Sequence, residues 1–478
     1  MNPSELESLE ADPADSPTPG PSDRLLEGPV AATLIRFAIP LLLSNLLGAL
    51  SGTWGAVWVS HVLGPNALTA VTNVNIFMGM MNGAVMGVGS AAGIAVGQAI
   101  GAADASMTRR VAATSVTFAI GASTLFALLT LIFAPAILNL IHMPAVAFDE
   151  AVTFFRITAL SMPPAFTFIF LMMLMRGTGD SRTPFNFTLV SIAVGLVATP
   201  LLLTGALGLP RLGIAGAAWS GVLANVLALA GMVAYIYWKD LPLAFKGEDL
   251  KLFRPDPTLL WMLVQRGTPM AMETFIVQGA YFVLLTMVNA QGAATAAAYA
   301  GAASLWGYVQ MPSGALAASM SAMAAMSIGA GQWDRVEQVA LKGCIVAGSL
   351  TLTAAALVYG LGDLPLKLLL PRGGEELEIA RNINHIVLWG WIVLAVTSGL
   401  SAMVRANAAM LAPTLIYATT MWVLRVPFAH FMQPILGPSA IWWSFPVGSV
   451  SSALLAFAYY RWGNWRANKL MVESIGGR

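Results

Sequence analysis

One acidic side chain, Glu273, lies far from both ends of the apolar segment that contains it, in the stretch Gly267-Thr-Pro269-x-x-x-Glu273. It falls about 15 residues into that segment, which is roughly 22 Å along a helix. If the segment crosses a membrane, a charge at this depth costs at least ~2.5 kcal/mol, so such a residue lines a cavity, pairs or exchanges a cation. We therefore predict that Glu273 is an ion-coupling carboxylate.

Arg425 gives Glu273 an alternative role. It lies at a similar depth in another apolar segment of the same half of the chain, so the two side chains could form a structural salt bridge. Arg425 itself suits a structural role, because an arginine remains charged in proteins and the nearby Pro427 leaves a backbone carbonyl for it to satisfy. Contact with a substrate is its other possible role.

Amide and phenol side chains recur in several apolar segments. They both donate and accept hydrogen bonds, so they suit a cavity that binds organic molecules. The same groups also hold membrane helices together, and both roles stay open for each residue. The candidates for lining a substrate cavity are Asn45, Asn73, Asn75, Gln278, Tyr281, Tyr299, Tyr308, Gln310 and Arg425.

The sequence contains no clear motif for an enzyme or for a metal site. The one cysteine, Cys344, and the 4 histidines lack the spacing of a zinc site, and we expect no metal and no cofactor. The stretch Gly177-Thr-Gly-Asp180 matches a short intramembrane protease motif, but no second embedded aspartate accompanies it. No HExxH, P-loop or serine elbow occurs either. The sequence therefore predicts neither an enzyme nor an ATP-driven pump.

The composition is that of a membrane protein. The 478 residues are 57% hydrophobic and 10% charged, with a mean hydropathy of +0.74, against about 25% charged residues in soluble domains. A net charge of +1 gives no reason to expect a nucleic-acid partner. Twelve segments are long enough to cross a bilayer: 31–60, 66–97, 108–134, 149–175, 184–204, 213–238, 258–289, 295–325, 335–360, 378–403, 412–432 and 439–462.

The two halves of the chain repeat each other at an offset of 228–229 residues. Pro40 is matched by Pro269, residues 100–101 by 328–329, and the stretch 175–184 by 404–413. Duplicated hydrophobic halves are typical of secondary transporters, whose two lobes rock about a shared cavity. We therefore predict an all-α membrane protein with two six-helix lobes, related by a pseudo-two-fold axis along the membrane normal.

The predicted organisation has five parts. A disordered acidic tail (1–30) precedes the first lobe (31–238), a cytoplasmic linker (239–257), the second lobe (258–465) and a cytoplasmic C-terminal tail (466–478). With the N-terminus inside, 18 of the 24 Lys and Arg residues fall on the cytoplasmic side and 5 outside. This bias predicts that both termini are cytoplasmic.

Several motifs resemble those of the multidrug and toxic compound extrusion (MATE) transporters, and the likeness covers about residues 31–465. It rests on Leu63-Gly-Pro-Asn-Ala-Leu-Thr-Ala70, Met175-Arg-Gly-Thr-Gly-Asp-Ser-Arg-Thr-Pro184, Gly213-Ile-Ala-Gly-Ala-Ala218 and the stretch around Glu273. The resemblance implies a V-shaped pair of lobes in the bacterial inner membrane. It also implies export of organic compounds driven by inward flow of protons or sodium.

One departure from that family bears on the coupling mechanism. Many prokaryotic members carry an aspartate in the outer half of the first helix, but the stretch 51–60 contains no acid and Gly55 occupies about that place. Glu273 is then the better candidate. We expect a monomeric antiporter for amphipathic organic compounds, with substrate bound between the first, second, seventh and eighth helices. The alternatives are a flippase for a lipid-linked saccharide and a passive channel.

Overall fold

The computed structural model describes residues 21–254, 256–370 and 373–468. This part of the chain is helical and contains no strand. Ten of its helices are both long and apolar enough to cross a bilayer. Two further spans complete the predicted set: α10, which is rich in Ala, Gly and Ser, and the helix that runs from α14 to α15 with an interruption. The twelve-helix architecture is thus confirmed.

The first lobe consists of six long helices and the second lobe repeats their order. In the first lobe they are α3 (Val30–Leu63), α4 (Pro65–Gly101), α5 (Ala105–Leu140), α6 (Ala145–Gly177), α7 (Arg182–Thr204) and α8 (Ile214–Trp238). In the second they are α9 (Pro257–Asn289), α10 (Ala293–Gly329), α11 (Trp333–Gly360), α13 (Glu375–Ala406), the interrupted helix α14–η4–α15 (Leu411–Ala418, Thr419–Arg425 and Val426–Phe431) and α17 (Ser439–Trp462).

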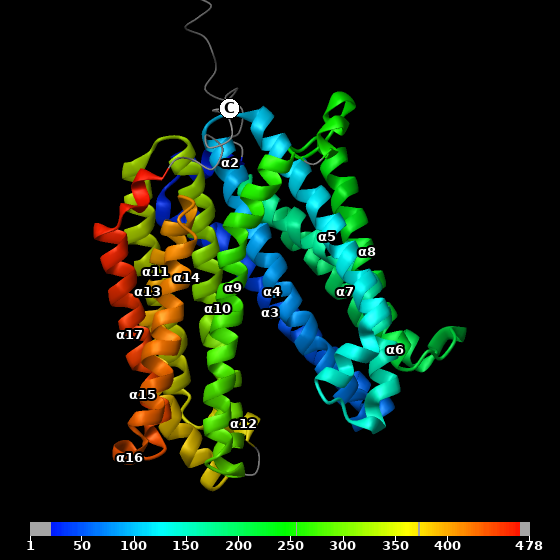
Figure 1. The fold of residues 1–478 in the computed structure, drawn as a ribbon, viewed down its shortest axis with the longest axis vertical. Coiled ribbons are helices and arrows are strands. Elements are labelled where there is room, and N and C mark those ends of the chain that lie inside the picture. Colours follow the sequence, from blue (N-terminus) through cyan, green and yellow to red (C-terminus); the bar gives the residue numbers. More distant parts are fainter. Residues whose placement is uncertain (1–20, 255, 371–372, 469–478) are drawn as a thin grey trace, which may run out of the picture.

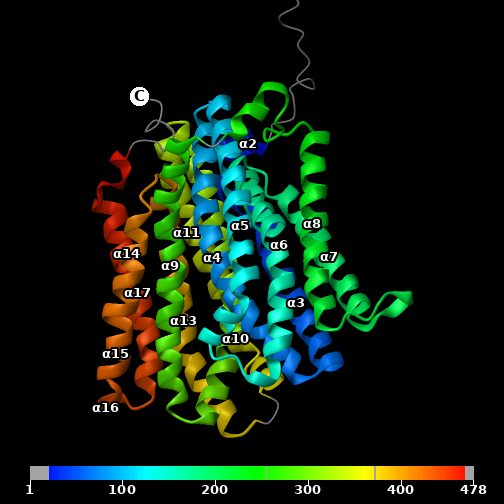
Figure 2. The same ribbon diagram turned by 45° about the vertical axis from the view of Figure 1, so that its right-hand side comes forward.

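Short helices complete the described chain. They are α2 (Pro21–Glu27), η2 (Ala206–Gly208), η3 (Gly247–Phe253), α12 (Leu364–Leu369), α16 (Gln433–Leu436) and η5 (Asn464–Ala467). The connection that contains η2 projects away from the first lobe (Figures 1 and 2).

The two lobes form a V. They meet at the end of the molecule where α2 lies, and they splay apart at the other end (Figure 1). The hydrophobic core follows this shape. One cluster of buried side chains, which includes Leu34, Ala95, Met320 and Ala325, spans both lobes at the joined end. The splayed ends have separate cores, one within each lobe.

Two equivalent helices, α4 and α10, cross at the joint between the lobes. A methyl group added to Gly101 would overlap the carbonyl oxygen of Met326, and one added to Gly329 would overlap the carbonyl oxygen of Gln98. Gly101 is equivalent to Gly329, and Gln98 to Met326, at an offset of 228 residues. Each helix therefore makes the same contact with the other, as at a two-fold axis. Small residues permit this close approach of two helix backbones.

The predicted disorder of residues 1–30 is wrong for the part that the structure describes. Residues 21–27 form α2, and the Leu25 side chain is buried. The Arg335 guanidinium in α11 donates hydrogen bonds to the carbonyl oxygens of Leu25 (2.9 Å) and Gly28 (2.7 Å). These bonds satisfy backbone groups that a short helix leaves unpaired. Residues 1–20, and residues 469–478 of the predicted C-terminal tail, lie outside the described chain.

Candidate functional site

A cavity of about 940 Å³ lies between the lobes. The first lobe contributes α4 and α6 to its wall, and the second contributes α9, α10, α13 and the interrupted helix α14–η4. Its apolar wall includes Met86, Met173, Phe282, Trp306 and Trp391, and its charged lining residues are Arg176, Glu273 and Arg405. A large apolar surface with a few convergent polar groups is typical of a site for small organic molecules.

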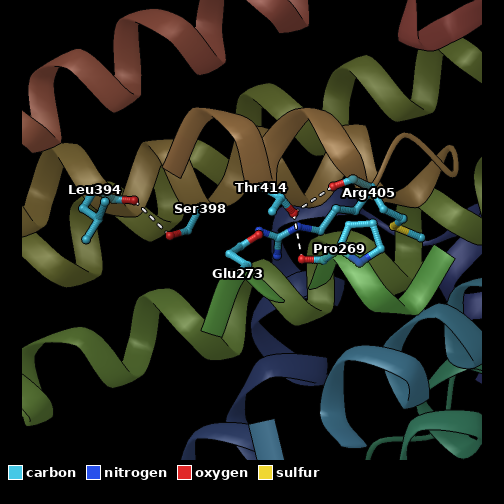
Figure 3. Close-up of polar contacts among 7 residues, drawn as sticks. Pro269, Glu273, Leu394, Ser398, Arg405 and Thr414 are labelled. Atoms are coloured by element: carbon cyan, nitrogen blue, oxygen red, sulfur yellow. Dashed lines mark hydrogen bonds and ion pairs between the residues drawn. The ribbon is translucent and has the colours of Figure 1, made fainter. Parts of the chain in front are cut away.

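Glu273 forms an ion pair with Arg405 at the wall of this cavity (Figure 3). The Nη2 atom of Arg405 donates to both carboxylate oxygens, at 2.7 Å to Oε1 and 2.9 Å to Oε2. The side chains of Arg405 and Glu273 are 20% and 17% exposed, so the pair is in contact with the cavity rather than sealed in the core. Such a carboxylate is accessible to an entering cation.

Pro269, one turn before Glu273, anchors this part of α9. Its carbonyl oxygen accepts a 2.9 Å hydrogen bond from the Thr414 hydroxyl in α14 (Figure 3). Thr414 Oγ1 also contacts the carbonyl oxygen of Met410 at 3.2 Å. This hydrogen bond ties α9 to the neighbouring helix α14 at the position of Pro269. This contact fixes the height of Glu273 relative to α14.

Five of the predicted residues come together in the cavity. Glu273, Gln278 and Tyr281 lie on α9, and Tyr299 and Gln310 lie on α10. Of the α9 residues, Gln278 and Tyr281 are three positions apart and therefore neighbours on the helix surface. The predicted contributions of the seventh and eighth helices therefore agree with the structure.

The other predicted cavity residues lie elsewhere. Asn45, Asn75 and Tyr308 are exposed but do not line the cavity. The Asn73 amide donates to the carbonyl oxygen of Thr69 in its own helix, at 2.9 Å. The first helix, α3, contributes no residue to the described lining, whereas α6 and α13, which were not predicted to do so, line it. Helix 1 and these four side chains thus lie outside the described lining of this cavity, and a role for them in substrate binding stays a prediction.

Arg425 is not the partner of Glu273. It is buried, with 4% of its surface exposed, and its guanidinium carbon lies 4.6 Å from the Phe445 ring centre and 5.0 Å from that of Tyr281. The Nε atom of Arg425 has no hydrogen-bond partner among the described residues. It lies at the end of the π-helical segment η4, inside the second lobe. The alternative of a salt bridge between Glu273 and Arg425 is therefore wrong, and a structural role for Arg425 fits the cation–π contacts.

Arg176 and Arg405 were both missed as cavity residues. The basic-residue count assigned them to the cytoplasmic side, but each lies one residue before the end of its helix and lines the cavity. The repeat contained the signal, because Met175-Arg176 matches Val404-Arg405 at an offset of 229 residues. A charged residue that recurs at equivalent positions of two lobes is expected to face their common axis.

Comparison with known proteins agrees with this architecture. Residues 40–201 and 269–431, one range in each lobe, match the profile of the MatE family. The probable multidrug resistance protein YoeA of Bacillus subtilis is 31% identical over 434 residues, which cover 89% of this chain and 92% of that protein. A second B. subtilis relative, the probable multidrug resistance protein YpnP, is 25% identical over 94% of this chain and 98% of its own length.

A solved structure shares the fold. The MATE transporter VcmN of Vibrio cholerae superposes with a TM-score of 0.84 at 17% identity, covering 94% of this chain and 99% of that one. Together with the family match over both lobes, this confirms the resemblance that the sequence motifs indicated. The chain belongs to the MatE family of multidrug transporters.

Proposed function

We propose that this protein exports amphipathic organic compounds across the bacterial inner membrane, in exchange for protons or sodium ions that flow inward. The observation that carries the proposal is the ion pair of Glu273 and Arg405 at the cavity wall. Both termini would be cytoplasmic, as the bias of Lys and Arg supports. The splayed end would then open the cavity to the outside.

The ion pair provides a way to couple cation entry to lobe movement. A proton or Na⁺ that enters from the splayed end would bind the Glu273 oxygens that now accept hydrogen bonds from Arg405 Nη2. The link between α9 and α13 would weaken as the carboxylate is neutralised. A ligand shifts a conformational equilibrium only by its different affinity for the two states. Because the cation competes with Arg405 for the Glu273 oxygens, it would bind more tightly to the state in which this ion pair is broken.

The two alternative functions have less support. A pyrophosphate-linked lipid would place at least two negative charges in the cavity, whereas the described charged lining sums to one net positive charge, from two arginines and one glutamate. The matched relatives are named as multidrug resistance proteins, which favours organic compounds. A passive channel would not support counterflow, so a counterflow assay separates it from a carrier.

Transport in proteoliposomes tests the proposal. Separate proton and sodium gradients are applied across a panel of fluorescent organic cations and anions. We expect one gradient to drive transport in the wild type and Glu273→Gln to reduce it at least about tenfold. The matched control is Glu337→Gln, because Glu337 pairs with Arg466 at the exposed surface (3.0 Å) and does not line the cavity. Wild-type gradient-driven rates in the Glu273 variant would refute the coupling role.

A further inference from the structure

Arg176 places an unbalanced positive charge in the cavity. It lines the cavity from α6, and its contact with a side-chain acceptor is the weak one from Nη1 to Met173 Sδ, at 3.8 Å. Its Nε atom is buried and has no hydrogen-bond partner, and no carboxylate of the described residues forms an ion pair with it. A guanidinium in an apolar site is costly without an anionic partner.

The repeat explains why Arg176 lacks such a partner. Its counterpart in the second lobe, Arg405, is neutralised by Glu273. At the same offset of 229 residues that relates Pro40 to Pro269, the position equivalent to Glu273 is Ser44. The Ser44 hydroxyl donates to the carbonyl oxygen of Pro40 in its own helix, at 2.8 Å. The first lobe therefore has the arginine at the equivalent position but a serine in place of the acid.

We infer that Arg176 binds the anionic group of the transported compound, so that the substrate class is organic molecules with a carboxylate or sulfonate and an aromatic or aliphatic body. The charged lining of the cavity sums to one net positive charge, from Arg176, Arg405 and Glu273. An anion fits this balance, and an organic cation would raise the total to two positive charges. The guanidinium matches the planar, bidentate geometry of a carboxylate.

The rest of the wall fits the body of such a compound. Met173 contacts Arg176, Met86 belongs to the same first-lobe part of the lining, and aromatic side chains line the cavity from α9, α10 and α13 in the second lobe. Thioether side chains adapt to ligands of different shape, and aromatic rings bury large apolar areas. The inference rests on the proposed function for the direction of transport, but the binding step does not depend on ion coupling.

Equilibrium binding to the full chain in nanodiscs of zwitterionic lipid, with no ion gradient, tests the inference. Two probes share the dansyl fluorophore and differ in charge: dansylglycine has a carboxylate and dansylcadaverine an ammonium group. We expect the wild type to prefer dansylglycine. Arg176→Gln should weaken dansylglycine binding about tenfold or more, the loss of one charge-assisted interaction, and leave dansylcadaverine binding unchanged or stronger. Arg176→Lys should retain most of the preference.

The matched control is Arg182→Gln, because Arg182 is exposed, begins α7 and does not line the cavity. It should bind both probes as the wild type does. Binding of dansylcadaverine by the Arg176 variant also shows that the cavity is folded. Tighter binding of dansylcadaverine than of dansylglycine by the wild type, or an equal loss of both probes in Arg176→Gln, would overturn the inference. Either result would leave the coupling test on Glu273 unaffected.

Discussion

The side-chain amide of Gln98 in α4 donates a 2.7 Å hydrogen bond to the carbonyl oxygen of Ala406 at the end of α13. The bond is buried and connects the two lobes at their joined end, next to Arg405 of the ion pair. A residue of the first lobe thus fixes the helix end that positions the arginine of the second lobe.

Replacing Gln98 with Leu should loosen this end of the molecule. The buried carbonyl group of Ala406 would lose its hydrogen-bond donor, which costs about 1–3 kcal/mol. We expect faster amide hydrogen exchange around residues 404–410, measured by mass spectrometry. Gln332→Leu is the control, because Gln332 is exposed at the start of α11. Identical exchange in wild type and Gln98→Leu would show that the bond does not hold the lobes together.

Arg405 and Glu273 should be energetically coupled. Arg405→Met leaves the Glu273 carboxylate without its partner and Glu273→Gln leaves the Arg405 guanidinium without its counter-charge, so each single variant should lower thermal stability. The double variant should be more stable than the sum of the single effects predicts, by about 1 kcal/mol or more. Tryptophan fluorescence during heating in detergent measures the cycle. Additive effects would mean that the pair contributes no interaction energy.

The crossing of α4 and α10 should not tolerate a methyl group. Gly101→Ala would force Met326 away and should destabilise the protein by about 1–3 kcal/mol, as overpacking does. Gly79 lies in the same helix, and a methyl group added there would meet nothing within 4 Å, so Gly79→Ala should be neutral or slightly stabilising. Thermal unfolding of both variants gives the comparison. Equal stability of the two would contradict the close approach of the helix backbones.

The pH dependence of transport should not depend on Asp256. This residue precedes α9; burial raises its pKa, but hydrogen bonds from Arg110 and the N–H groups of Leu259 and Thr258 outweigh that effect and hold the pKa below its usual value of 3.8. Because the pKa of Asp256 is lowered, its stabilising ion pair with Arg110 is present at every pH above the usual pKa. The pair is lost only as the pH falls through the lowered pKa. The pair therefore stays ionised between about pH 5 and 8.

Asp256→Asn should accordingly keep the wild-type pH profile of transport in that range, and an asparagine still caps the helix. The surface ion pair contributes at most about 1 kcal/mol, so expression should change little. Initial transport rates at several pH values measure the profile. A flatter pH profile of transport in Asp256→Asn would contradict this prediction, because it would mean that Asp256, which lies outside the cavity, contributes to the proton dependence.

The sequence was sufficient for the helices, the duplication and half of the site. Apolar runs predicted the spans, and the polar side chains Glu273, Gln278 and Tyr281 within one of these runs were correctly expected to line a cavity. The partner of Glu273 was beyond this reasoning. Arg425 was chosen because its depth is similar to that of Glu273, whereas Arg405 was assigned to the cytoplasmic side because it lies near the end of its segment. Depth in a segment does not show which side chains of other helices reach the same point.

The amides show the same limit. Asn73 has a suitable side chain but donates to Thr69 within its own helix, because a helix in a bundle turns only part of its surface toward the cavity. Whether such a polar group faces a substrate or its own backbone depends on rotation about the helix axis. Neighbouring helices set that rotation, and a single sequence does not contain their positions.

The apolar cores are divided between a shared cluster at one end and two separate clusters at the other. If the lobes exchange which end is closed, apolar surface becomes hydrated at one end while a similar area is dehydrated at the other. The change in heat capacity should then nearly cancel, since it scales with the net apolar area exposed. Warming should therefore alter the ratio of the two forms far less than it alters the fraction of unfolded chains.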